Sequence, residues 1–152
     1  MNQIKDIALY IVIAIVINLL SFLLDGKYFI EYLIANLITV QLTLLAINTA
    51  TSGLVISKMQ DIKKDNPKLN LKPISKSLLD SLKEQIILVI IAIVLLIVID
   101  SKITTKSLYS NYIDFGLAVV LIAVFINSVQ ILWDTGKSIF LMVEMTDLND
   151  SN

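Results

Sequence analysis

The feature that most constrains this chain is its long stretches of apolar sequence without charge. Residues 7–24 and residues 32–57 contain no Asp, Glu, Lys or Arg. An α-helix rises ~1.5 Å per residue, so the first stretch alone spans roughly 27 Å, close to the ~30 Å hydrocarbon thickness of a bilayer. Two further apolar stretches, residues 86–99 and 113–133, follow. This pattern is typical of helices that cross a membrane.

Composition agrees with lipid as the solvent for most of the chain. Hydrophobic residues make up 57% of the sequence and charged residues 16%, whereas globular proteins contain about 45–50% and about 25%. We therefore predict an all-α integral membrane protein, a helical bundle that forms one transmembrane domain over residues 1–152. Its four transmembrane helices are expected at about residues 6–24, 30–57, 78–101 and 112–134.

The segments between and after these helices are predicted from their charges and from their turn residues. Residues 25–27, Asp-Gly-Lys, form a tight turn in which we expect Gly26 to supply the backbone freedom. Residues 58–85 form a Lys-rich linker, broken by proline between residues 66 and 73, with Ser75 or Ser77 as the N-cap of a helical lead-in. Residues 135–152 are expected to form a tail.

The distribution of lysine predicts the orientation. The linker of residues 58–85 holds seven of the 12 lysines, and cytoplasmic segments carry the excess of positive charge. The linker and, with four spans, both the N- and C-termini are therefore expected in the cytoplasm. Only Lys27, Lys102 and Lys106 fall on the opposite side. Abundant Asn, Lys and Ile fit an origin in a low-GC bacterium or a mobile element.

The residues that are absent exclude most enzymes. The chain has no His and no Cys, and all 12 basic residues are lysine. Disulfides, thiolate chemistry, haem ligation by His and metal sites built from His or Cys are therefore excluded. We expect no enzymatic activity, no catalytic residue, no cofactor and no metal. Coupled transport is also disfavoured, because it normally needs an ionisable group within the membrane and no span has a charge near its middle.

The second span is the most polar, and its polar residues fall on separate faces. Helix residues three, four or seven apart share a face. This spacing predicts one face with Asn36, Thr39 and Thr43, a roughly opposite face with Gln41, Asn48 and Ser52, and a strip of Ala46, Ala50 and Gly53. A helix with three faces that avoid lipid is expected at the centre of the bundle. We expect a homo-oligomer, with a tetramer as the working assumption.

Similar stripes occur in the first and fourth spans. They comprise Ala14, Asn18, Ser21 and Asp25 in the first, and Gly116, Val120, Ala123, Asn127, Gln130 and Asp134 in the fourth. Uncharged polar side chains can line an ion pathway. They also commonly form hydrogen bonds between membrane helices, and this second interpretation stays open for each residue. The pore-lining candidates are Asn36, Thr39, Thr43, Asn48, Thr51, Ser52, Asn127, Gln130 and Asp134.

One segment carries a resemblance to known proteins. It is NLITVQLTLLAINTA at residues 36–50, which runs on into KMQDIKK at residues 58–64. In plan and polarity the whole chain resembles the small four-helix membrane effectors of bacterial antiphage defence, such as the HalB component of Hailong systems and the RexB-type abortive-infection protein of lambdoid phage. The resemblance implies a homo-oligomeric channel that depolarises the inner membrane when a cytoplasmic sensor signals infection.

The same resemblance implies a regulator. In Hailong-type systems the partner is a nucleotidyltransferase, and its DNA-oligomer product holds the channel closed. The residues that would contact such a polyanion here are Lys63, Lys64, Lys68, Lys72 and Lys76. The alternative function is a non-conducting membrane scaffold or accessory subunit, which recruits a cytoplasmic partner through the lysine-rich linker and the tail.

Overall fold

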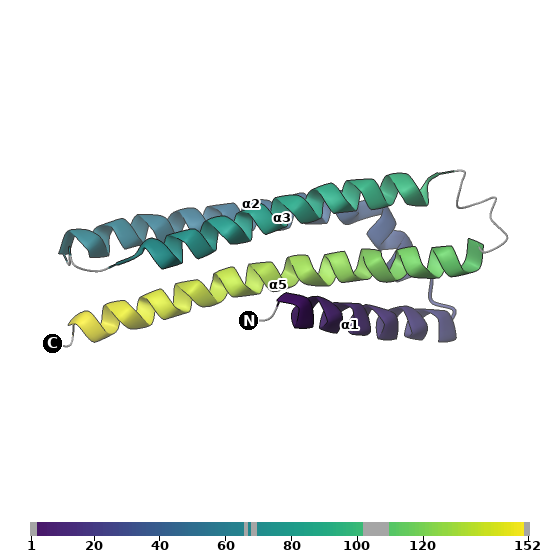
Figure 1. The fold of residues 1–152 in the computed structure, drawn as a ribbon, viewed down its shortest axis with the longest axis horizontal. Helices are drawn as coiled ribbons and strands as arrows, with labels where there is room; N and C mark the ends of the chain where they lie inside the picture. The colour runs from purple at the N-terminus through teal and green to yellow at the C-terminus, as the bar shows by residue number, and fades with distance from the viewer. Residues whose placement is uncertain (1–2, 66, 68–69, 102–109, 151–152) are drawn as a thin grey trace.

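The computed structural model describes residues 3–65, 67, 70–101 and 110–150. The described residues form four helices, α1 (Gln3–Leu23), α2 (Tyr28–Asp65), α3 (Lys72–Ile99) and α5 (Ser110–Asp150), which run roughly alongside one another (Figure 1). Each of the four contains a segment long and apolar enough to cross a membrane. The expectation of an all-helical chain with four such helices is confirmed, and it indicates a multi-pass membrane protein.

The helix at the centre of the bundle is α5. It packs against α1, α2 and α3, whereas the main packing partner of α1 is α5 alone. In Figure 1, α5 lies between α1 on one side and the α2–α3 pair on the other. The expectation that the second span is central was therefore wrong for the single chain. That expectation took polarity as the sign of a central helix, but the centre of this bundle is mostly apolar.

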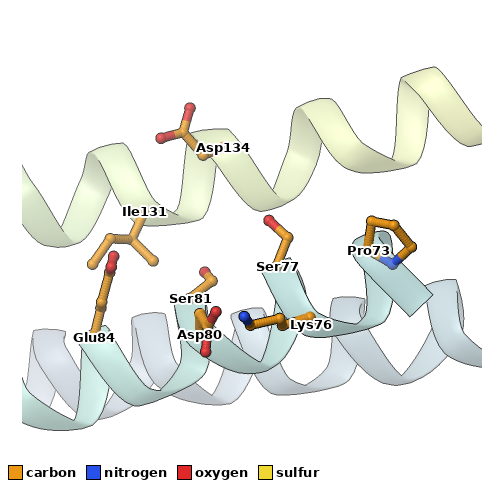
Figure 2. Close-up of a pocket in the computed structure, with 8 residues that line it drawn as sticks. All are labelled: Pro73, Lys76, Ser77, Asp80, Ser81, Glu84, Ile131 and Asp134. Atoms are coloured by element: carbon orange, nitrogen blue, oxygen red, sulfur yellow. The ribbon is translucent and has the colours of Figure 1, made fainter. Parts of the chain in front are cut away.

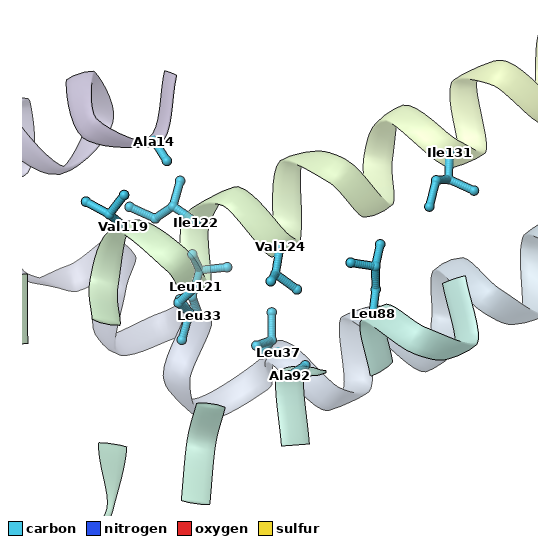
Figure 3. Packing of buried hydrophobic residues seen from close by; sticks show 10 residues of the cluster. All are labelled: Ala14, Leu33, Leu37, Leu88, Ala92, Val119, Leu121, Ile122, Val124 and Ile131. Carbon is cyan, nitrogen blue, oxygen red and sulfur yellow. The ribbon is translucent and has the colours of Figure 1, made fainter. Parts of the chain in front are cut away.

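The main core forms where apolar side chains of all four helices meet around α5 (Figure 3). Leu121 and Ile122 of α5 and Leu37 of α2 are completely buried members of this core. Ala14 of α1 and Ala92 of α3 are also completely buried. Their small side chains let the two helix backbones approach the core closely. The remaining buried members are Leu33, Leu88, Val119, Val124 and Ile131.

The stripe predicted for the first span does face a neighbouring helix. Ala14 and Asn18 are buried, and Asn18 Nδ2 donates a hydrogen bond of 3.2 Å to the backbone carbonyl of Phe115 in α5. In the turn that follows α1, Asp25 has φ 48° while no glycine among the described residues has a positive φ. The left-handed residue of this turn is therefore Asp25 and not Gly26, and Asp tolerates that conformation better than most residues.

The helices continue further than the sequence indicated. α2 runs past residue 57 to Asp65, and α3 begins at Lys72 with Pro73 in its first turn, where proline is well tolerated. The N-cap of α3 is Leu71, without a side-chain hydrogen bond, so the assignment of Ser75 or Ser77 to this role was wrong. α5 continues through the predicted tail to Asp150.

A second hydrophobic cluster explains why these extensions are helical. Val55 and Met59 of α2 and Leu78 of α3 are buried together, with half-buried Ile139 of α5 packed against them. The stretch predicted as a solvated linker carries apolar residues at helical spacing, and their burial against each other holds α2, α3 and α5 together beyond the main core. The lysine-rich end is therefore packed and not a loose linker. We call this end of α2, α3 and α5, built around Val55, Met59, Leu78 and Ile139, the packed extension.

Candidate functional site

The outer face of α2 carries small and polar residues at an alternating spacing of three and four. These residues are Asn36, Thr39, Thr43, Ala46, Ala50, Gly53 and Ser57, and all except half-buried Asn36 are exposed. A side-chain carbon added at Gly53 would meet no atom within 4 Å. The same spacing brings helices together in coiled coils, and small residues allow close approach in membranes. We call these seven residues the small-residue face.

Hydrogen bonds on this side of α2 stay within the helix. Thr43 Oγ1 donates to the carbonyl of Thr39 at 2.8 Å, and Asn36 Nδ2 donates to the carbonyl of Tyr32 at 3.0 Å. Such bonds leave the hydroxyl of Thr43 paired in any surroundings. The face can therefore pack against another helix without leaving the Thr43 hydroxyl unpaired.

The opposite face of α2 is inside the chain. Asn48 is fully buried, and its Nδ2 donates to Gln85 Oε1 of α3 at 2.6 Å and to Ser81 Oγ at 3.3 Å. Ser81 is joined in turn to Thr135 of α5 at 3.0 Å. Gln41, also fully buried, accepts a 2.8 Å hydrogen bond from Ser128 Oγ of α5. Side-chain hydrogen bonds thus connect α2 to both α3 and α5.

The pore-lining candidates of α2 therefore occupy two environments. Asn36, Thr39 and Thr43 lie on the outer side, whereas Asn48 and Ser52 are buried between helices of the same chain. Thr51 is half-buried. Sequence reasoning separated the two polar faces correctly, but it treated Ala46, Ala50 and Gly53 as a third strip, whereas they continue the outer face. It also missed Gln85, Ser81 and Ser128 as partners. A usable signal existed for Gln85, because it shares the helical spacing of the other buried residues of α3, Leu78, Leu88 and Ala92.

The candidates of the fourth span line a groove between α1, α3 and α5. Asn127, Gln130 and Asp134 of α5 face a hollow of about 480 Å³. An adjoining hollow of about 450 Å³ lies between α3 and α5 (Figure 2), and the two share Glu84, Ile131 and Asp134. We call the two hollows together the acidic groove. Its other acidic residues are Asp6 and Asp80.

The carboxylates of the acidic groove are spread along it. Gln130 Nε2 donates to Asp134 Oδ1 at 3.2 Å, and Lys137 Nζ lies 3.9 Å from the same oxygen. Figure 2 shows Ser77 and Glu84 of α3 pointing toward α5, whereas the Asp134 carboxylate points away from α3. Within the described ranges no three acidic residues are close enough together to hold a metal ion. The groove therefore offers dispersed negative charge rather than a compact coordination site.

The lysines proposed for regulator binding lie at the packed extension. Lys63 and Lys64 of α2 and Lys72 and Lys76 of α3 are exposed, and Lys68 lies outside the described residues. Lys64 forms a 3.4 Å ion pair with Asp61. An exposed pair of this kind contributes only about 0–1 kcal/mol and leaves the lysine able to exchange partners. This end of the bundle therefore presents lysines from two helices on its surface.

Comparison with protein-family models, with curated proteins and with solved structures finds no match to this chain. The functional argument therefore depends on the geometry of these surfaces.

The hydrogen bond between Asn48 and Gln85 can be tested by a double-mutant cycle. We expect N48A and Q85A to couple by ~0.6 kcal/mol and at most ~1.7 kcal/mol, the range measured for hydrogen bonds between membrane helices. The measurement is reversible unfolding of the purified protein in mixed detergent micelles. The control cycle pairs N48A with T43A on the opposite face, and its free energies should add within ~0.3–0.5 kcal/mol. Equal coupling in the two cycles would contradict the contact.

Proposed function

We propose that this protein is a subunit of a homo-oligomeric ion channel in a bacterial inner membrane. The observation that supports the proposal is the small-residue face of α2, which no helix of the described chain covers and whose spacing suits contact between helices. Copies that meet along this face bring α2 to a shared axis. The tetramer is retained as the working assembly.

In this assembly α2 lines the pathway with Asn36, Thr39 and Thr43. Their carboxamide and hydroxyl groups replace part of an ion's hydration shell, and the neighbouring Ala46, Ala50 and Gly53 allow the helices to converge. Asn48 holds α2 to its own chain through its hydrogen bonds, and Ser52 is buried inside the same chain, so neither takes part in the pore. One polar face of α2 thus lines the pathway, and the other contacts the same chain.

The acidic groove supplies negative charge near the lysine-rich end of the bundle. Asp6, Glu84 and Asp134 line it together with Asn127 and Gln130. The whole groove carries four carboxylates, with Asp80 as the fourth, against one lysine, Lys76. A cleft with a net negative lining concentrates cations. In the proposed orientation, with the lysine-rich end and both termini in the cytoplasm, the groove raises the local concentration of cations on the cytoplasmic side.

The biological role that we propose is depolarisation of the membrane during phage infection. This part of the proposal is supported by the resemblance to antiphage effectors in the order of spans, the tight turn and the lysine-rich end. The packed extension joins the lysines to α5 through Ile139. A nucleotidyltransferase, or its DNA-oligomer product, bound to these lysines would therefore act on a helix that also lines the acidic groove.

A second candidate function is a non-conducting membrane scaffold. It is favoured by the internal hydrogen bonds of Gln41 and Asn48, which account for much of the polarity of α2 within one chain. A scaffold would still display the lysine-rich extension to a cytoplasmic partner. It differs from the channel in showing no conductance.

The channel proposal is tested by cross-linking and by conductance. The natural chain has no cysteine, so a disulfide in a single-cysteine variant must join two copies. We expect A46C and A50C to form cross-linked dimers in membranes, and V94C, at a position exposed on α3, to form few. The purified protein should give discrete conductance in planar bilayers, reduced or abolished by A50L but retained by V94L.

Two results would contradict the channel. Equal cross-linking of A50C and V94C would show that copies do not meet along the small-residue face. Absence of conductance from an oligomer that does cross-link there would support the scaffold instead.

Regulation by a polyanion is tested by removing the lysines. We expect replacement of Lys63, Lys64, Lys72 and Lys76 by Gln to weaken binding of a short DNA oligomer and to flatten its dependence on salt, because each lost phosphate contact reduces the number of counterions released. The control is K27Q, which removes an exposed lysine at the other end of the bundle. Binding is measured by fluorescence anisotropy at several salt concentrations. Unchanged affinity in the fourfold variant would remove these lysines as the binding site.

A further inference from the structure

Four buried polar atoms have no hydrogen-bond partner among the residues that the structure describes. They are Gln41 Nε2, Asn48 Oδ1, Ser52 Oγ and Gln85 Nε2. Gln41, Asn48 and Gln85 are fully buried, and Ser52 is 2% exposed. A buried donor or acceptor without a partner destabilises a protein, and in native proteins such atoms are usually hydrogen-bonded to protein groups or to ordered water. Three of the four atoms lie at or next to Asn48: its own Oδ1, Ser52 Oγ one helical turn away, and the Nε2 of Gln85, to which Asn48 is hydrogen-bonded.

Reorienting the amides does not remove the deficit. The oxygen and nitrogen of a carboxamide can exchange places in a structure. If both amides were turned over, Gln85 Nε2 would donate to Asn48 Oδ1, and Asn48 Nδ2 and Gln85 Oε1 would then lack partners. The pair of amides offers more hydrogen-bonding groups than the two residues can satisfy between themselves, so a further polar molecule is needed in either arrangement.

A hydrogen-bonded route joins these atoms to the surface. Ser81 lines the acidic groove, where its side chain is half-buried, and Ser81 Oγ also accepts the hydrogen bond from Asn48 Nδ2. Gln85 lies one helical turn further along α3 and accepts from the same Nδ2. A continuous series of polar groups therefore leads from the groove to the interior between α2 and α3. It passes from Ser81 to Asn48 and then to Gln85. Figure 2 shows Ser81 at the wall of the groove beside Glu84.

We propose that water enters the bundle from the acidic groove past Ser81 and binds between α2 and α3. The binding groups are Gln85 Nε2, a donor, Asn48 Oδ1, an acceptor, and Ser52 Oγ, which can act as either. Buried waters typically make about three hydrogen bonds, and these groups supply that number. The interface between α2 and α3 therefore holds water, although the rest of the bundle interior is mostly apolar. It does not depend on conduction, because a scaffold with the same interior would hold the same water.

Cysteine accessibility tests this site in the full-length protein in membranes. A thiol reacts with a water-soluble methanethiosulfonate only as the thiolate, which requires water at the sulfur. We expect S81C to react fastest and S52C to react at least roughly tenfold faster than A92C, a fully buried position of α3 within the apolar core. Modification of S81C with S52C as slow as A92C would overturn the proposal, since water would then stop at the groove.

A second measurement uses the unsubstituted protein, so that misfolding of a variant cannot obscure the result. Solid-state NMR of protein labelled with ¹⁵N at Gln and Asn, in lipid bilayers, detects transfer of magnetisation from water to side-chain amides. The Gln85 amide, assigned by its loss in Q85L, should receive this transfer. Asn18, buried and bonded to the carbonyl of Phe115, is the dry reference. Equal, negligible transfer to Gln85 and Asn18 would exclude water at the site.

Discussion

The hydrocarbon of a bilayer offers no hydrogen-bond partner, and this constraint organises the whole bundle. A polar side chain there must pair within its own helix, with another helix or with water. α2 shows the first two solutions on opposite faces. Thr43 bonds to its own helix on the outer face, whereas Asn48 bonds to α3 and Gln41 to α5 on the inner face. The third solution, water, is the one that we propose for the atoms left unpaired near Asn48.

The continuity of α5 connects the two ends of the molecule. Its apolar residues form the centre of the main core, its polar residues Asn127, Gln130 and Asp134 line the acidic groove, and Ile139 packs into the second cluster beside the lysine-rich extension. A packed helix transmits a displacement along its length more directly than a flexible linker would. An event at the lysine-rich end can therefore reach the groove through one element, in keeping with a regulated membrane protein.

Much of the fold could be predicted from the sequence because helices that lie in lipid need long stretches of apolar residues. Four apolar stretches predicted four helices, and the spacing of polar residues predicted two distinct faces of α2. The helix ends could not be predicted as well. Met59 and Leu78 lie among charged residues, and Ile139 lies in the predicted tail, so their mutual burial becomes apparent only when α2, α3 and α5 are packed together.

The candidate site was predictable only in part, for a related reason. A polar face in the sequence indicates that these residues avoid lipid. It does not indicate whether they contact the same chain, another copy or water. Asn48 and Ser52 could be assigned to an inner face from spacing alone, yet their surroundings depend on where α3 docks. Gln85 was overlooked because it lies at the charged end of its span. α5 was not recognised as central because its buried face consists largely of apolar residues. The buried polar residues on it, Ser128 and Thr135, are small.

The central claim is that α2 divides its polar residues between its own chain on one face and neighbouring copies on the other. A cryo-electron microscopy reconstruction of the protein in lipid nanodiscs tests this most directly. Our account predicts several copies that meet along Asn36, Thr43 and Ala50 of α2, with Asn48 and Gln85 in contact inside each copy. A particle with a single copy whose small-residue face meets only lipid, or an assembly joined through other helices, would contradict it.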